Sequence, residues 1–230
     1  MSGKRRRKRK AGRIRSRRRI QLYTRVGLGI LAILFIYLGT SKLLGGSLFG
    51  WREQYRERIG EDIDASRPDL DVQLLTVNEY SRPGTKTGRI NGIVIHYTAN
   101  PGSTAMQNRD YFEGLKDSHE TKASSHFVVG MKGEIVQCVP TWEVAYASND
   151  RNHDTVSIET CHPKKDGKYT KETYRSLVEL TAWLCKKFDL DENDVIRHYD
   201  VTGKICPKYF VEDEKAWERF REDVGKMMKK

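Results

Sequence analysis

The sequence predicts an α/β domain, in which a mixed central β-sheet carries flanking helices, preceded by an N-terminal transmembrane helix. Two observations favour the α/β domain. Short β-branched runs alternate along the chain with amphipathic stretches of helical period. The 230 residues also suffice for one well-packed domain plus an appendage. A third observation indicates the transmembrane helix: a charge-free apolar segment, residues 26–41, directly follows a dense basic run.

Residues 1–25 form a basic tail. They hold 13 of the 42 Lys and Arg and no acid, which leaves 29 basic residues against 31 acidic ones in the rest of the chain. The formal net charge of +11 therefore belongs to the tail, and the body of the protein is nearly neutral. This division argues against a nucleic-acid partner for the whole chain. A polybasic nucleic-acid or nuclear-type tail is the alternative for residues 4–10. In that interpretation the His and Cys residues of the domain would hold structural zinc, and DNA binding would fall steeply with salt.

The apolar segment after the tail predicts a signal anchor over residues 26–51. Its 16 charge-free residues would span about 24 Å as a helix, slightly short of a hydrocarbon core of about 30 Å. Lys42 can snorkel outward, and the apolar residues that follow end at Trp51. A buried core helix and a cleaved signal peptide are the alternatives, although no small-x-small cleavage site follows.

The basic flank orients this anchor. Positive residues stay on the cytoplasmic side, so residues 1–25 are expected in the cytoplasm and residues 52–230 outside the cell membrane. Residues 52–76 are charged and contain Pro68, which predicts a juxtamembrane spacer. The folded domain is expected over residues 77–230.

The first half of the domain predicts three strands and a helix. "GIVIHYT" at residues 92–98 is a β-branched run typical of a buried central strand. Residues 104–115 have helical spacing after a small-residue start. Strands at residues 124–130 and 134–139 flank a hairpin turn at residues 131–133, which contains glycine.

The second half predicts two strands and two helices. "TVSIETC" at residues 155–161 is a strand, and "DVIRH" at residues 194–198 is a shorter one. Residues 213–228 form a closing amphipathic helix. Residues 171–188 give the strongest helical pattern, because their apolar side chains share one stripe: Tyr174, Leu177, Val178, Thr181, Leu184, Cys185 and Phe188.

The segment "RHYDVTGKICP" predicts a metal site. His198 and Cys206 are eight positions apart, which is roughly 12 Å along a helix and about 26 Å along a strand, so neither form lets both bind one ion. Asp200 and Gly203 can turn the chain back. His96, at the end of a buried strand, is the expected third ligand. Three protein ligands leave one tetrahedral position open, the arrangement of a catalytic zinc site.

The other four histidines have less specific surroundings. His126 alternates with Phe127 on its strand and is expected to be structural. His119, His153 and His162 lie among polar loop residues and are expected to be solvated.

The four cysteines contain no C-x-x-C pair, so the sequence indicates neither a redox motif nor a zinc ribbon. Cys185 lies on the apolar face of a predicted helix and is expected to be a buried thiol. Cys138 and Cys161 lie on strands that could be neighbours, which leaves a disulfide between them open.

Four segments of the predicted domain form a recognisable series: "GIVIHYTANPGSTA", "SSHFVVGMKGEIVQCVP", "VSIETCHP" and "RHYDVTGKICP". In this order and at these separations, they resemble the N-acetylmuramoyl-L-alanine amidase family. This is the zinc amidase fold shared by amidase-type phage lysozymes and peptidoglycan recognition proteins. The resemblance covers roughly residues 77–225 and implies that His96, His198 and Cys206 are zinc ligands, in agreement with their spacing.

The resemblance also implies two catalytic residues. Glu159, in "VSIETC", matches the acid that activates water, and Lys204 matches the cation that stabilises the oxyanion. In some amidase-type phage lysozymes a tyrosine directly precedes the histidine of the "SHF" strand. Here Ser125 holds that position, so the proton transfer is assigned to Glu159.

The implied function is zinc-dependent hydrolysis of the amide bond between N-acetylmuramic acid and L-alanine in peptidoglycan, for cell wall degradation or remodelling. The expected partners are peptidoglycan and, through the anchor, the cell membrane, with the domain outside and facing the cell wall. A monomer is favoured. The alternative is a non-catalytic peptidoglycan-binding module of the same fold. Some recognition proteins lack the ligand cysteine, so Cys206 favours catalysis.

Overall fold

The computed structural model describes Asp64 and residues 66–230. The predicted tail, the predicted anchor and most of the predicted spacer lie outside these described residues. Among the described residues, no helix has both the length and the apolar character that crossing a membrane requires.

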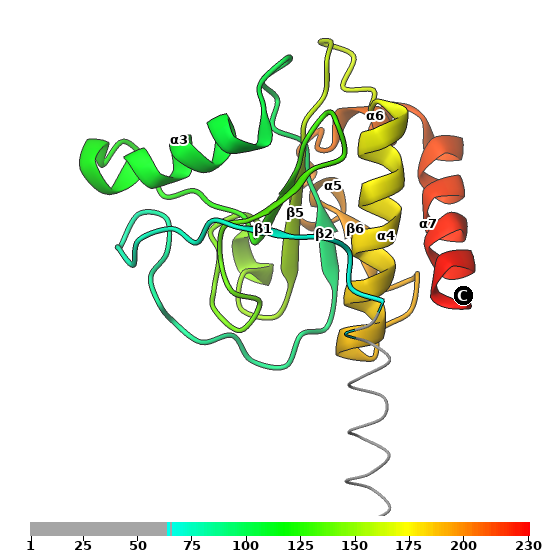
Figure 1. Ribbon diagram of the computed structural model, residues 1–230, viewed down its shortest axis with the longest axis horizontal. Helices are drawn as coiled ribbons and strands as arrows, with labels where there is room; N and C mark the ends of the chain where they lie inside the picture. Colours follow the sequence, from blue (N-terminus) through cyan, green and yellow to red (C-terminus); the bar gives the residue numbers. More distant parts are fainter. Residues whose placement is uncertain (1–63, 65) are drawn as a thin grey trace, which may run out of the picture. The chain divides into compact units, whose positions relative to one another are not determined.

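A mixed β-sheet forms the middle layer of the described domain (Figure 1). Its six strands follow the order β1-β4-β3-β5-β2-β6, and only the β3–β4 pair is antiparallel. The strands are β1 (Asp71–Val72), β2 (Ile93–Ile95), β3 (Phe127–Val129), β4 (Ile135–Gln137), β5 (Val156–Thr160) and β6 (Val195–Arg197). The predicted mixed central sheet with flanking helices is confirmed.

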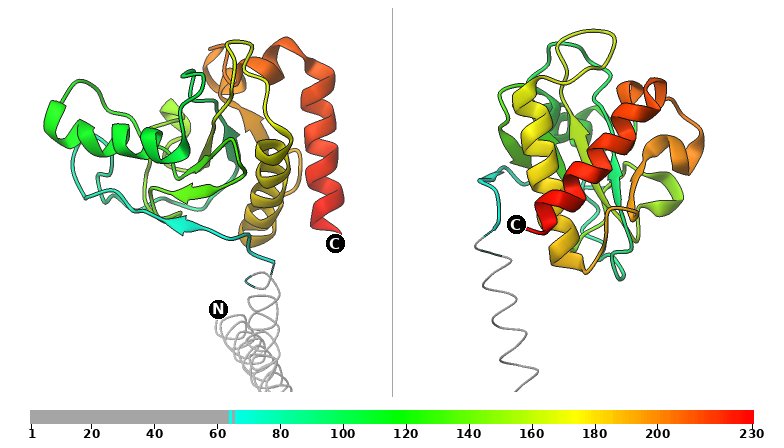
Figure 2. Two further views of the ribbon diagram at one scale, coloured as in Figure 1. Left: turned by 45° about the horizontal axis from the view of Figure 1, so that its top comes forward. Right: turned by 90° about the vertical axis from the view of Figure 1, so that its right-hand side faces the viewer.

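Helices cover both faces of the sheet. Figure 2 shows α4 and α7 side by side on one side of the sheet, with α3 on the other. The helical elements are α3 (Ala105–Ser118), the 3₁₀ turn η1 (Asn149–Arg151), α4 (Lys171–Phe188), α5 (His198–Thr202), α6 (Lys208–Glu212) and α7 (Glu214–Met228).

The alternation of side chains along each strand separates two cores. In β3, Phe127 and Val129 join the larger core with α4 and α7, whereas Val128 between them joins the smaller core with α3. Leu177 and Leu184 of α4 and Phe220 of α7 are fully buried in the larger core. The sheet is therefore apolar on both faces, as expected for parallel strands covered on both sides.

Local sequence fixes the ends of several elements. Thr104 caps α3, because its Oγ1 accepts from Gln107 N (3.1 Å) while Gln107 Oε1 accepts from Thr104 N (2.9 Å). The predicted 171–188 helix agrees with α4 at both ends. The predicted turn at residues 131–133 joins β3 to β4, and Gly133 has a φ of 87°, which glycine adopts without strain.

The N-terminal boundary of the domain was predicted too late in the chain. The spacer was placed over residues 52–76, but β1 pairs with β4 inside the sheet and Leu75 is 1% exposed. The folded domain therefore begins before residue 77. Both residues of β1 are exposed, so no apolar alternation marks this strand in the sequence.

Candidate metal centre

Three neighbouring parallel strands bring the predicted site residues to one edge of the sheet. β2 lies between β5 and β6, and both neighbours run parallel to it. His96 directly follows β2, Glu159 lies near the end of β5, and His198 directly follows β6. Because the carboxyl ends of parallel strands meet at one edge, side chains far apart in sequence converge there.

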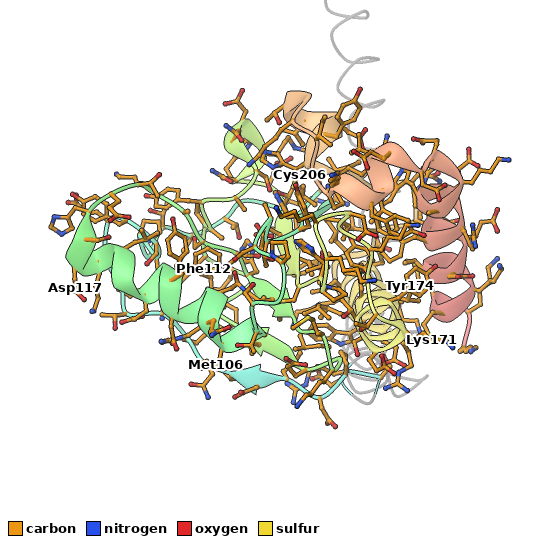
Figure 3. All side chains as sticks on the ribbon, turned by 90° about the horizontal axis from the view of Figure 1, so that it is seen from above. Met106, Phe112, Asp117, Lys171, Tyr174 and Cys206 are labelled. Carbon is orange, nitrogen blue, oxygen red and sulfur yellow. The ribbon has the colours of Figure 1, made fainter. Side chains whose placement is uncertain are left out.

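Cys206 reaches the same place through a short helix. α5 spans His198–Thr202, and its C-cap residue Gly203, with a φ of 77°, turns the chain back. Tyr199 N then donates to the carbonyl oxygen of Cys206 at 2.8 Å, which closes the loop. Viewed from above, Cys206 lies between α3 on one side and α4 and α7 on the other (Figure 3). The chain doubles back between His198 and Cys206 as predicted, but it does so through a short helix.

The side chains of His96, His198 and Cys206 form one cluster. Their ligand atoms all lie within 4.8 Å of one another, and the three residues are 1%, 7% and 3% exposed. His96 Nδ1 lies 3.9 Å from Cys206 Sγ, and the two imidazole rings are 4.6 Å apart. Two imidazoles and a thiol are a donor set that zinc binds. These residues could therefore hold a zinc ion through three protein ligands.

Burial favours the neutral form of both imidazoles. It lowers the pKa of His96 well below the ordinary value, and the charges of His198 and Lys204 lower it further. Burial, followed by the charge of Lys204, also lowers the pKa of His198. A neutral imidazole has the free lone pair that metal binding needs. Burial raises the pKa of the Cys206 thiol to about 12.

Glu159 carries an unpaired oxygen. Its Oε2 is buried and has no hydrogen-bond partner among the described residues. Burial raises the pKa of Glu159 to about 7, against the opposing effect of the Lys204 charge. A buried carboxyl group without a partner is costly, and such groups cluster at functional sites.

Lys204 is exposed and lies on the loop between α5 and Cys206. Burial has the largest effect on the pKa of Glu159 and of each clustered side chain, and the charge of Lys204 lowers all four values. One cation therefore acts electrostatically on every other predicted site residue.

Ser148 and Asn149 also contact this cluster, although neither was among the predicted site residues. His96 Nε2 lies 3.2 Å from Ser148 Oγ, and His198 Nε2 lies 3.0 Å from Asn149 Oδ1. Arg197 was missed as well. This residue directly precedes His198, and its guanidinium donates to Asp200, to Glu214 and to the carbonyl oxygen of Phe210. Ser148 and Asn149 lie in a polar segment, where the sequence shows no periodic signal.

The remaining histidines divide differently from the prediction. His126 is structural, as predicted: its Nε2 donates to the carbonyl oxygen of Glu143 at 2.9 Å, and its Nδ1 accepts from Ser157 N at 3.0 Å. His119 and His153 are exposed. His162 was predicted to be solvated, and this is wrong, because it is 1% exposed. Its Nδ1 donates to the carbonyl oxygen of Lys164 at 2.7 Å.

All four cysteines are free and buried. The open question of a Cys138–Cys161 disulfide is thus resolved in favour of two thiols, since β3 separates β4 from β5 in the sheet. Cys185 is the buried thiol that was expected.

The sequence matches a known family over more than half of its length. The family described as N-acetylmuramoyl-L-alanine amidase matches residues 86–209. N-acetylmuramoyl-L-alanine amidase CwlL of Bacillus licheniformis is 41% identical over an alignment of 168 positions, which covers 67% of this chain and 46% of CwlL. A probable N-acetylmuramoyl-L-alanine amidase of the same species is 38% identical, over 67% of this chain and 47% of that protein. The chain therefore spans about half the length of the curated relatives it matches.

Solved structures share the fold. A mutant endolysin from Bacillus subtilis superposes with a TM-score of 0.59 at 24% identity, covering 69% of this chain and all of that one. The structure of PlyL superposes with a TM-score of 0.61 at 21% identity, covering 70% of this chain and 99% of that one. At these identities the likeness establishes the fold.

Proposed function

Because this chain belongs to the N-acetylmuramoyl-L-alanine amidase family, we propose that it hydrolyses the amide bond between N-acetylmuramic acid and L-alanine in peptidoglycan. The names of its curated relatives support this choice of bond. The observation that carries the proposal is the convergence of His96, His198 and Cys206 at the sheet edge that also holds Glu159.

In this proposal His96, His198 and Cys206 hold a zinc ion. When bound, zinc supplies Lewis acidity, which lowers the pKa of water and polarises a carbonyl group. The two neutral imidazoles can bind without losing a proton. The thiol of Cys206 has a pKa of about 12, so it must release its proton when a metal binds.

Glu159 is proposed as the general base and acid. A carboxyl group whose pKa lies near 7 can accept a proton from water and later donate it to the departing amine. Proton transfer by a positioned side chain contributes typically about 10² to 10⁴-fold in rate.

Lys204 is proposed to stabilise the negative charge that develops on the amide oxygen. Its ammonium group is close enough to lower the pKa of Glu159 and of the three proposed ligands. A donor in this role is typically worth about 2.7–4 kcal/mol of transition-state stabilisation.

Mass spectrometry of digested peptidoglycan tests this function. The zinc-loaded protein should release peptides with a free N-terminal L-alanine. Glu159→Ala should reduce this release by about 10² to 10⁴-fold, and Cys206→Ala should abolish it together with stoichiometric zinc binding. Cys185→Ala is the matched control, because it removes another buried thiol, from α4.

Two outcomes would overturn the hydrolase. New reducing sugar ends without free L-alanine would indicate a glycosidase. Binding to peptidoglycan without any release, in the presence of sufficient zinc, would leave the non-catalytic binding module as the function.

We further propose that residues 26–51 anchor the chain in the cell membrane, with the folded domain outside and facing the cell wall. The basic residues before this segment support that orientation, since positive flanks stay in the cytoplasm. The proposed substrate lies on the same side of the membrane as the domain would.

A further inference from the structure

Ser148 and Asn149, two consecutive residues of the segment between β4 and β5, contact both histidines of the cluster. Ser148 Oγ lies 3.2 Å from His96 Nε2, and Asn149 Oδ1 lies 3.0 Å from His198 Nε2. We infer that Ser148 and Asn149 are positioning residues, which fix the tautomer of the two imidazoles and direct both Nδ1 atoms at the metal. This inference rests on the metal centre of the proposed function.

The acceptor on Asn149 determines the tautomer of His198. A neutral imidazole carries one N–H and one lone pair, and an amide oxygen can only accept a hydrogen bond. With Asn149 Oδ1 at 3.0 Å, the proton of His198 belongs on Nε2. The lone pair is then on Nδ1, which is the nitrogen left to bind a metal.

The same assignment holds for His96 on separate evidence. Its Nδ1 faces Cys206 Sγ at 3.9 Å, so Nδ1 is the ring nitrogen directed at another member of the cluster. The opposite nitrogen, Nε2, faces Ser148 Oγ. A hydroxyl oxygen can accept the Nε2 proton, which again leaves the lone pair on Nδ1.

The segment that carries both partners is held in one conformation. Asn152 Oδ1 accepts from Ala147 N at 3.0 Å and from Ser148 N at 2.6 Å. Arg151 N donates to the carbonyl oxygen of Ser148 at 3.0 Å. Asn149 has a φ of 51°, in the left-handed region that Asn tolerates better than most residues. The two side chains therefore come from a turn that hydrogen bonds fix on both sides.

This turn gives the two histidines one common support. The histidines follow different strands, β2 and β6, and consecutive residues hold both of them. Partners of this kind orient metal ligands, and their loss typically weakens metal binding by about 10 to 100-fold.

Zinc affinity of the purified full chain in detergent, measured by competition with a chromophoric chelator, tests the inference. Asn149→Gly removes the acceptor while suiting the left-handed backbone, and Ser148→Ala removes the hydroxyl. Each should weaken zinc binding by about 10 to 100-fold. Asn149→Asp keeps an acceptor oxygen and should retain the affinity. Asn193→Gly makes the same change in an exposed turn before β6 and should have no effect.

Two further measurements separate positioning from folding. The visible absorption of bound Co²⁺ should change in Asn149→Gly and return in Asn149→Asp, because this spectrum reports the geometry of the ligands. The melting temperature of the metal-free protein should stay close to that of wild type in Asn149→Gly and in Asn149→Asp. If Asn149→Gly and Ser148→Ala both kept the zinc affinity and the Co²⁺ spectrum of wild type, the positioning inference would be overturned and the metal centre would stand. If wild type itself bound no zinc, the metal centre would fail first.

Discussion

At the scale of single residues, the buried position of Glu159, the proposed general base, opposes stability. Its folded-state pKa is about 7, above the ordinary value of 4.5, because it is buried. Between these pH values the folded state binds one more proton than the unfolded state, so the free energy of unfolding falls as pH rises. The penalty is fully developed above pH 7 and absent below pH 4.5.

Glu159→Gln should therefore stabilise the metal-free protein at pH 8 and leave its stability unchanged near pH 4. The expected gain at pH 8 is on the order of 3 kcal/mol, because the pKa rises from 4.5 to about 7 and each pKa unit corresponds to about 1.4 kcal/mol. Urea unfolding of both proteins at pH 4, 6 and 8, with a chelator present, measures it. The same substitution should reduce peptidoglycan hydrolysis by about 10² to 10⁴-fold, because it removes the proposed general base.

The control for this prediction is Glu120→Gln, which makes the same change at an exposed position beyond α3. It should alter neither stability nor activity. A stabilisation by Glu159→Gln that had the same size at every pH would show that the carboxyl group does not titrate between the folded and unfolded states as described.

The sequence identified the residues of the cluster because each has a local signal. His96 ends a buried β-branched run, and His198 and Cys206 flank a stretch with turn residues. For His162 the sequence indicated a solvated loop position, since this residue precedes a proline, two lysines and an aspartate. It is buried because the ring lies 5.2 Å from that of Tyr97, a contact between segments that local polarity does not report. Ser148 and Asn149 likewise look like ordinary loop residues until the fold brings them to the histidines.

At the scale of elements, α5 depends on Arg197. The Arg197 side chain is 10% exposed, and it bonds Asp200 in α5, Phe210 in α6 and Glu214 in α7. Its guanidinium also lies over the ring of Trp217 at 5.3 Å. One cation thus joins three helices around the segment that carries His198 and Cys206.

Arg197→Ala should destabilise the domain by about 2–4 kcal/mol, because the buried carbonyl oxygen of Phe210 loses its guanidinium donor. The carboxylate of Asp200 also loses its ion pair and keeps only the backbone N–H of residue 197. Arg197→Lys should recover only part of this loss, since an ammonium group cannot form the same forked pairing. Zinc affinity should fall in both variants, because α5 supports two of the proposed ligands. Urea unfolding and chelator competition measure the two effects.

Arg175→Ala is the matched control for this clamp, because that side chain is 70% exposed and its nearest carboxylate oxygen, on Glu179, is 3.9 Å away. It should change stability by less than about 0.5 kcal/mol. Equal effects of the Arg197 and Arg175 substitutions would contradict a clamping role for Arg197.

Elements long enough to repeat their apolar pattern several times were predictable from the sequence, and very short elements were not. α4 was predicted at both ends because 18 residues display a continuous apolar stripe. α5 has five residues, of which only His198 is buried, so it shows no helical stripe. β1 has two exposed residues and joins the sheet through backbone pairing with β4. Backbone pairing and side-chain clamps depend on tertiary contacts, which is why sequence periodicity missed both elements.

At the scale of the whole molecule, the proposed anchor would hold the domain beside its proposed substrate. The apolar segment at residues 26–41 contains nine Val, Leu, Ile and Phe residues. At about −0.3 to −0.6 kcal/mol each near the centre of a membrane helix, they favour insertion by roughly 3–5 kcal/mol. The basic tail alone could attract the chain to anionic lipids, but that attraction is screened at high salt.

These two modes of attachment predict different fractionation. If residues 26–51 form the anchor, the full chain should stay in the membrane pellet in 1 M salt and at alkaline pH, and only detergent should release it. A chain lacking residues 1–51 should be soluble and should still hydrolyse isolated peptidoglycan, because the described fold starts after them. Replacing the basic residues at positions 4–10 by serine should leave the chain in the pellet, since its apolar segment is intact. Release of the full chain by salt alone would mean that the tail binds by charge and that no segment crosses the bilayer.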